Sequence, residues 1–323
     1  MGCWLLAAGS IWAQRVPGRY IVELTTEPVT EHVARMGLQA GMRSTEAVTQ
    51  RARVRTQQAR TRLALEAAQA TVLDSVDTVA NALFVQVSDA QAGALAAMPG
   101  VKRVLPERRF KLLLDRAVAL HKVTEAWSQI GDDKAGAGVK IAIIDTGIDQ
   151  THPGFADDSL VMPEGFPKVN AASHVSFATN KVIAARSYVS LLPYRDPDTT
   201  PQDHVGHGTA LAMIAAGVRN AGPLATIQGV ASKAFLGSYK VFGTPGYNDS
   251  ASDSAILKAM DDAVADGMDI INLSLGDDFA PRLADDIDVD AVERAVRAGV
   301  IVVVAAGNNG PGLNTIGSPA TAP

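Results

Sequence analysis

The feature that most constrains the fold is a series of largely apolar runs in the second part of the chain, separated by helical patterns. Short apolar runs without polar alternation are typical of strands buried on both faces of a sheet. Such runs occur at residues 139–144, 237–242, 269–275 and 300–305, and helices are predicted between them at 207–217, 251–265 and 286–298. The order predicts an α/β fold with a parallel sheet and helices on both faces. Functional side chains of such sheets gather at the carboxyl ends of the strands.

The first part of the chain has a different pattern. Short strands are predicted at residues 19–24, 82–87 and 101–105, with helices at 45–71 and 89–98. This order is typical of a small α+β domain, and 323 residues are enough for two domains. We therefore predict a small α+β domain of roughly 90 residues, followed by a larger α/β domain.

The two parts differ in charge. Residues 1–116 carry 15 Lys/Arg against 10 Asp/Glu, whereas residues 117–323 carry 14 against 24. Two units of opposite charge attract each other, although unequal surface composition alone also produces such a difference. The charges are consistent with two domains that dock.

The N-terminal segment, residues 1–14, is apolar and ends in small residues, with Ala13 as a candidate cleavage point. This pattern predicts a signal peptide and a secreted protein; a buried first strand is the alternative. Cys3 is the single cysteine, so no disulfide can form within the chain. No run reaches the roughly 18 apolar residues of a membrane helix. Aromatic residues make up only 5%, which disfavours base stacking, so we expect neither a membrane nor a nucleic-acid partner.

Asp145 directly follows the apolar run 139–144, in the sequence Asp-Thr-Gly-Ile. Its carboxylate is therefore expected at the carboxyl end of a buried strand, beside the flexible Gly147. An aspartate that caps a turn has the same local pattern. Asp-Thr-Gly also occurs in aspartic proteases, but their chemistry needs two carboxylates that share a proton. No second Asp-Thr-Gly or Asp-Ser-Gly is present.

His207 lies between Gly206 and Gly208 at the start of a small, apolar helix. Glycine on both sides leaves the imidazole uncrowded. The alternatives are a structural histidine and a metal ligand paired with His204. A metal site needs further ligands at suitable spacing, and no Glu-x-x-His or cysteine partner accompanies the two histidines. We assign no metal ligand.

Asn308 follows the run 300–305 and a glycine. An asparagine in this setting commonly forms a turn. Its side-chain amide can also stabilise a developing oxyanion, which contributes about 3–4 kcal/mol to catalysis in known cases.

Together and in this order, these segments closely resemble the subtilase (subtilisin-like, S8) family of serine peptidases. Asp-Thr-Gly-Ile from Asp145 is similar to the aspartate motif of that family, and His-Gly-Thr from His207 is similar to its histidine motif. Ala-Ala-Gly-Asn, ending at Asn308, matches its oxyanion segment, and residues 271–276 (INLSLG) match its substrate-binding strand. The resemblance extends from about residue 118 to the last residue.

Residues 19–110 resemble, more loosely, the inhibitor-type (I9-like) propeptide of these proteases. The similarity begins at Tyr20-Ile21-Val22 and ends near residues 99–107 (PGVKRVLPE). The resemblance implies a ferredoxin-like prodomain that acts as a folding chaperone and inhibitor of its own protease.

The resemblance also implies a mechanism and a substrate class. Asp145 would orient His207, His207 would transfer the serine proton to the leaving amine, and Asn308 would hold the oxyanion. An extended peptide would pair with the edge formed by Ser274, Leu275 and Gly276, and the primary specificity pocket would be walled by Ala305, Ala306 and Gly307. No cofactor is identified; calcium is frequent in the family, but we assign no site.

The sequence departs from the family pattern in two respects that bear on function. The Gly-Thr-Ser-Met-Ala-like motif of the nucleophile is absent, and we assign no catalytic role to Ser318, the last serine, because Pro319 disfavours a helix there. We therefore expect residues 1–323 to be a C-terminally truncated precursor without activity of its own. Asp277 and Asp278 follow Gly276 where small residues are common, which predicts a preference for basic or polar substrate residues.

The leading interpretation is a serine endopeptidase precursor. The alternative is a non-catalytic chaperone or protease inhibitor that acts through residues 19–110. A Rossmann-type binding domain is disfavoured because no Gly-x-Gly-x-x-Gly follows a strand.

Overall fold

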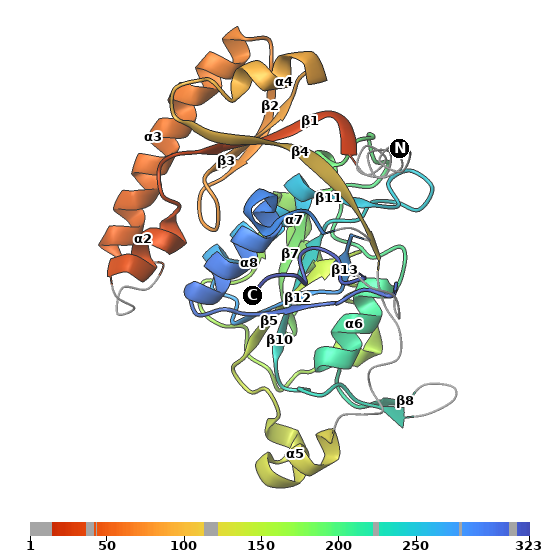
Figure 1. The fold of residues 1–323 in the computed structure, drawn as a ribbon. Helices are drawn as coiled ribbons and strands as arrows, with labels where there is room; N and C mark the ends of the chain where they lie inside the picture. Colours follow the sequence, from red (N-terminus) through yellow and green to blue (C-terminus); the bar gives the residue numbers. More distant parts are fainter. Residues whose placement is uncertain are drawn as a thin grey trace, which may run out of the picture.

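A computed structural model of the chain describes residues 15–36, 42, 44–112, 122–221, 226–277, 280–309 and 315–323. The predicted signal peptide, residues 1–14, and Asp278 lie outside the described residues. Figure 1 shows two packed units: an N-terminal one with an antiparallel sheet, and a second one built on a parallel sheet.

The N-terminal unit confirms the predicted α+β domain. Its four strands lie in the order β4–β1–β3–β2, and neighbours are antiparallel. The strands are β1 (Arg15–Leu24), β2 (Thr71–Val76), β3 (Ala82–Gln86) and β4 (Val101–Leu112). The helices are α2 (Val29–Met36), α3 (Thr45–Ala67) and α4 (Asp89–Leu95). The long, strongly polar α3 begins at the cap Ser44, whose side chain accepts a hydrogen bond from the Ala47 amide.

The second unit confirms the predicted parallel sheet. The strand order is β14–β12–β5–β10–β7–β6, and all these pairs are parallel. The strands are β5 (Lys140–Asp145), β6 (Lys168–Val169), β7 (Val182–Ser187), β10 (Phe235–Lys240), β12 (Ile270–Leu273) and β14 (Ile301–Val304). The predicted segments at 139–144, 237–242, 269–275 and 300–305 correspond to β5, β10, β12 and β14, whereas β6 and β7 were not predicted.

Helices cover both faces of this sheet (Figure 1). On one face, α6 (His207–Ala216) packs Ala212, Met213 and Ala216 into a cluster with Ile141 and Ile143. On the other face lie α7 (Asp253–Asp266) and α8 (Ile287–Arg297). The remaining elements are α5 (Val123–Ile130), β8 (Asn220–Ala221), β9 (Thr226–Ile227), β11 (Ala251–Ser252) and β13 (Leu275–Gly276).

The two units share one hydrophobic core. Ile21, Val76 and Phe84 of the N-terminal sheet belong to the same buried cluster as Met260 of α7 and Val292 of α8. Burial of large apolar side chains contributes about 1.5–3 kcal/mol each, so the contact does not depend on charge alone. In Figure 1 the N-terminal sheet lies against α7 and α8.

Strand β4 continues beyond its own sheet into the second unit. It pairs antiparallel with β11 at Arg109–Ser252 and Phe110–Ala251, and with β13 at Lys111–Gly276 and Leu112–Leu275. The last strand of the N-terminal unit is therefore hydrogen-bonded to two short strands of the second unit, β11 and β13.

Candidate active site

Asp145 is the last residue of β5, and His207 is the first residue of α6. His207 Nδ1 lies 2.7 Å from Asp145 Oδ1. An ionised carboxylate only accepts hydrogen bonds, so the contact assigns the shared proton to Nδ1 of the imidazole. The Thr146 amide donates a second hydrogen bond, 2.7 Å long, to the same carboxylate oxygen.

Glycines determine how closely the two elements approach. Gly206, just before α6, has φ +89°, a left-handed conformation that favours glycine. Gly208 lies against the backbone of Gly147, because a Cβ on Gly208 would be 2.2 Å from the Gly147 carbonyl oxygen. The Gly208 amide also donates a 2.8 Å hydrogen bond to Thr146 Oγ1. A side chain at Gly208 would separate the histidine from the aspartate.

Asp203 holds the loop before α6, and sequence reasoning missed it. Its Oδ1 accepts hydrogen bonds from the amides of Val205 and Gly206, and its Oδ2 accepts from the amide and hydroxyl of Thr209. Burial disfavours its charge, but these hydrogen bonds outweigh burial and hold the pKa of Asp203 below its usual value. The signal available in the sequence was an aspartate six residues before a threonine in the first turn of a helix.

The side chains of Asp145 and His207 are largely shielded from solvent. The Asp145 side chain is fully buried, and the His207 side chain is 14% exposed. Burial raises the pKa of Asp145, while the hydrogen bond and charge of His207 act in the opposite direction. Nε2 of His207 is buried and has no hydrogen-bond partner among the described residues. This nitrogen therefore has its lone pair available for a proton from another group.

Asn308 follows β14 at the carboxyl edge of the same parallel sheet as Asp145. It is exposed, and no hydrogen bond connects it with Asp145 or His207 within the described part of the chain. The structure thus brings Asp145 and His207 into direct contact and places Asn308 on the same rim.

The segments predicted to bind a peptide lie at this rim too. Leu275 and Gly276 form β13, and Ser274 precedes it, with its Oγ 3.1 Å from Asn272 Nδ2. The Ala305 amide donates a 3.0 Å hydrogen bond to the Leu273 carbonyl, which joins β14 to the β12–β13 segment; Ala306 and Gly307 follow. The edge of β13 pairs with Lys111 and Leu112 of β4.

Ser318 lies away from the pair. Its Oγ is 3.4 Å from Arg108 Nη2, and its carbonyl accepts a hydrogen bond from the Asp277 amide. His204 Nε2 lies 2.5 Å from Asp198 Oδ2. Within the described ranges, no three His, Cys, Asp or Glu side chains are grouped so that they could hold a metal ion. No described helix is long and apolar enough to cross a bilayer.

A parallel sheet with an Asp–His pair at its carboxyl rim, and an antiparallel domain whose last strand reaches that rim, is the arrangement of a subtilisin-like peptidase with its prodomain. Residues 136–323 match the model of the Subtilase family, and residues 19–113 match that of Peptidase inhibitor I9. The chain belongs to the subtilase family of serine peptidases.

Curated relatives include the subtilisin-like proteases SBT1.4 of Arabidopsis thaliana and SBT3 of Solanum lycopersicum. They are 32% and 31% identical to this chain, and each alignment covers 76% of the chain and 34% of the relative. The chain therefore spans about a third of the length of these relatives.

Two solved structures have the same fold. Fervidolysin from Fervidobacterium pennivorans, a keratinolytic enzyme related to subtilisin, has a TM-score of 0.55 at 16% identity, over 92% of this chain and 40% of that one. The epidermin leader peptide processing serine protease of Staphylococcus aureus has a TM-score of 0.54 at 20% identity, over 92% and 61%.

Proposed function

We propose that the complete protein is a secreted serine endopeptidase and that residues 19–110 are its inhibitory prodomain. The observation that carries the proposal is the 2.7 Å contact between Asp145 Oδ1 and His207 Nδ1, next to a strand edge that already binds an extended segment. Membership of the subtilase family supports the reaction class. The apolar residues 1–14, ending in small residues, support secretion.

In the proposed mechanism, Asp145 fixes the tautomer and orientation of His207. The nucleophilic serine hydroxyl gives its proton to Nε2 as its oxygen attacks the peptide carbonyl. Asp145 then stabilises the imidazolium, and His207 returns the proton to the leaving amine as the C–N bond breaks. The Asn308 side-chain amide donates a hydrogen bond to the oxyanion. Water hydrolyses the acyl-enzyme with His207 as general base.

The proposed substrate is an extended peptide. Antiparallel pairing with β13 gives sequence-independent hydrogen bonds to the peptide backbone. The pairing of Lys111 and Leu112 with this edge supports the proposal, because β4 occupies it as a substrate would. The same pairing supports inhibition by the prodomain, since one edge cannot pair with two strands at once. Ala305, Ala306 and Gly307 remain the proposed wall of the primary specificity pocket.

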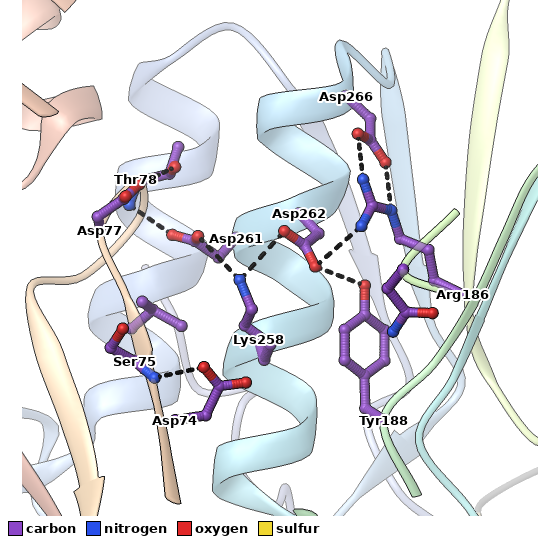
Figure 2. Close-up of polar contacts among 12 residues, drawn as sticks. Asp74, Ser75, Asp77, Thr78, Arg186, Tyr188, Lys258, Asp261, Asp262 and Asp266 are labelled. Carbon is purple, nitrogen blue, oxygen red and sulfur yellow. Dashed lines mark hydrogen bonds and ion pairs between the residues drawn. The ribbon is translucent and has the colours of Figure 1, made fainter. Parts of the chain in front are cut away.

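Charged groups also join the prodomain to the second unit. Glu23 of β1 lies 3.4 Å from Arg294 of α8, and Arg103 of β4 bridges Glu23 and Asp290. On α7, Asp261 Oδ1 accepts hydrogen bonds from the Thr78 and Val79 amides of the prodomain, at 2.5 and 2.9 Å. Figure 2 shows Asp261 reaching the Thr78 amide. These contacts support a prodomain that stays docked without a covalent linkage.

The test is casein hydrolysis by the complete protein. His207→Ala should abolish hydrolysis, whereas His204→Ala, three residues away and 43% exposed, should retain it. Activity that survives His207→Ala would refute the mechanism. The non-catalytic alternative predicts no hydrolysis by the complete protein and inhibition of other subtilases by the prodomain.

A further inference from the structure

Arg108 of β4 lies with its guanidinium group between the first turns of α7 and α8. Its Nη2 is 2.9 Å from Asp286 Oδ1 and 2.6 Å from Asp288 Oδ2, and its Nε is 3.4 Å from Asp253 Oδ1. Its backbone amide donates to Asp253 Oδ2, and Nη2 also lies 3.4 Å from Ser318 Oγ. One prodomain side chain thus contacts carboxylates from two helices of the second unit.

These carboxyl groups and that of Asp277 form a cluster around the guanidinium, which we call the aspartate pocket: Asp253, Asp277, Asp286 and Asp288. All four are buried, and the side chains of Asp286 and Asp288 are fully inaccessible. Asp286 caps α8 through the amides of Asp288 and Val289, which fixes its orientation. Its second oxygen, Oδ2, is buried and has no hydrogen-bond partner among the described residues. The pocket is therefore a built site with acceptor capacity directed at a cation.

The pocket places several carboxyl groups around a single guanidinium cation. Burial, opposed by Arg108, and the charge of Asp286 raise the pKa of Asp288 to about 6. Burial raises the pKa of Asp253 well above its usual value, again against the effect of Arg108. Arg108 is the cation that opposes both upward shifts, so its guanidinium favours the ionised forms of Asp253 and Asp288. The geometry thus favours a bound cation, whichever chain supplies it.

The same strand, β4, contacts both the aspartate pocket and the proposed peptide-binding edge of β13. Arg108 immediately precedes the two residues that pair with β11, and these precede the two that pair with β13. It therefore lies four residues before Leu112 on one continuous strand. Any peptide that binds the β13 edge in the register of β4 places its corresponding residue at the aspartate pocket.

We propose that the aspartate pocket is a specificity subsite for arginine in peptide substrates, occupied by Arg108 until the prodomain leaves. The inference rests on the proposed peptidase function. A planar guanidinium can engage Asp286 and Asp288 through one nitrogen and Asp253 through another, which a single ammonium group cannot do with the same geometry. The pocket thus selects arginine over lysine. The sequence predicts a preference for basic or polar substrate residues on the basis of Asp277 and Asp278. The aspartate pocket, which contains Asp277, gives this preference a defined site.

The first test uses the complete protein and peptides with the sequence of residues 105–116 (LPERRFKLLLDR). One peptide has citrulline, which is uncharged and similar in shape, at the position of Arg108; the matched control has citrulline at the position of Arg109. We measure inhibition of casein hydrolysis. Losing charge-assisted hydrogen bonds should raise the apparent inhibition constant about tenfold or more for the first peptide only. Equal inhibition by all the peptides, or by none, overturns the proposal.

Variants of the enzyme test whether the difference in inhibition between the citrulline and arginine peptides arises at the aspartate pocket. Asp288→Asn should reduce the ratio between the citrulline and arginine peptides toward one. Asp285→Asn, which makes the same charge change at an exposed residue three positions earlier, should preserve the ratio. An unchanged ratio in Asp288→Asn refutes the pocket. Absence of casein hydrolysis by the wild type instead refutes the proposed peptidase function, so the two failures are distinguishable.

The second test uses the present chain and needs no activity. Arg108→Ala should lower the melting temperature, and millimolar ethylguanidinium should restore part of the loss, whereas ethylammonium should restore less. The rescue should disappear in the double variant with Asp286→Asn. Equal rescue by both cations, or none by either, contradicts a guanidinium site. If Arg108→Ala does not fold, the peptide comparison on the complete wild-type protein still decides.

Discussion

Asp145 and His207 are 62 residues apart in the chain, yet their side chains lie 2.7 Å apart. The contact is fixed from both sides. The Thr146 amide holds the Asp145 carboxylate, and Thr146 Oγ1 accepts a hydrogen bond from the Gly208 amide. The residue after the aspartate is thus bound to the residue after the histidine, so the first turn of α6 and the end of β5 position each other.

Replacing Asp145 with asparagine tests the electrostatic part of this contact. Asp145→Asn keeps the side-chain shape but allows the wrong imidazole tautomer, and kcat of the complete protein on peptides should fall by about 10⁴. The exposed Asp158→Asn is the matched control and should retain wild-type activity. A residual rate above one tenth in Asp145→Asn would show that the carboxylate does not serve the histidine.

Gly208→Ala tests the steric part. A Cβ would lie 2.2 Å from the Gly147 carbonyl oxygen, and backbone atoms cannot yield cheaply. We expect a loss of about 1–3 kcal/mol of unfolding free energy, as for other overpacked positions, measured by denaturant unfolding. Gly93→Ala is the control, because Gly93 lies in helix α4 with open space around it. It should stabilise the protein by about 0.5–1 kcal/mol. Equal effects of the two substitutions would contradict the close approach.

The sequence predicted the elements whose local pattern is unambiguous. β5 and β14 each contain four consecutive apolar residues, at 141–144 and 301–304, a pattern typical of strands in a parallel sheet. The expected burial on both faces holds for β5 but not for β14, which lies at the edge of the sheet with Ile301 and Val303 exposed. β7 (VIAARS) was missed because Arg186 interrupts the run; its guanidinium pairs with Asp266 and Asp262 on α7, a compensation that only the fold provides. β2 was missed because Asp74 and Ser75 make it half polar.

Site residues, like strands, could be predicted only where the local sequence carries a signal. Asp145 and His207 were found because each stands in a short motif with glycine. The aspartate pocket was not predicted as a unit, because its members begin two helices and follow β13, at positions where acidic residues commonly stabilise helix N-termini. The sequence contains nothing local that links them with Arg108. Long-range pairing of β4 with β13 creates that relation, and it depends on register rather than composition.

Glu23 is the centre of a buried charge cluster between prodomain and second unit, with Lys102 at 3.0 Å and Arg294 at 3.4 Å. Burial disfavours its charge, but hydrogen bonds and charges of Arg103 and the other cations hold the pKa below the usual value of 4.5. The contribution of Glu23 to stability is therefore present above about pH 4.5 and is lost as the pH falls through the lower, folded-state pKa.

Glu23→Gln leaves the buried Arg294, and Arg103 beside it, without their shared counter-charge. We expect a loss of about 3 kcal/mol of unfolding free energy at pH 7, measured by chemical denaturation. The control is Glu27→Gln, since Glu27 pairs with Arg35, which is 62% exposed, and such pairs contribute about 0–1 kcal/mol. Below pH 4 the difference between wild type and Glu23→Gln should shrink. A loss no greater than that of the control would mean that the cluster does not secure the prodomain.

Asp261 has the opposite pH behaviour. It is buried between the Thr78 and Val79 amides and Lys258, whose Nζ lies 3.9 Å from its Oδ2 (Figure 2). Burial, opposed by Lys258, and the charges of Asp77 and Asp262 raise its pKa from 3.8 to about 7. Folding therefore takes up a proton at this carboxyl group between these pH values. Its contribution to stability is full below about pH 3.8 and is lost as the pH rises through about 7.

Asp261→Asn removes this proton uptake. The wild-type melting temperature should therefore fall more steeply with rising pH between the unfolded pKa of 3.8 and the folded pKa of about 7 than that of Asp261→Asn, because over that range only folding of the wild type takes up a proton at this position. Asp133→Asn, at an exposed position, should follow the wild-type slope. Asp288, whose pKa is also raised, is present in all three proteins and cancels in the comparison. Parallel slopes for the wild type and Asp261→Asn would show that the contact with Thr78 and Val79 does not depend on a buried proton.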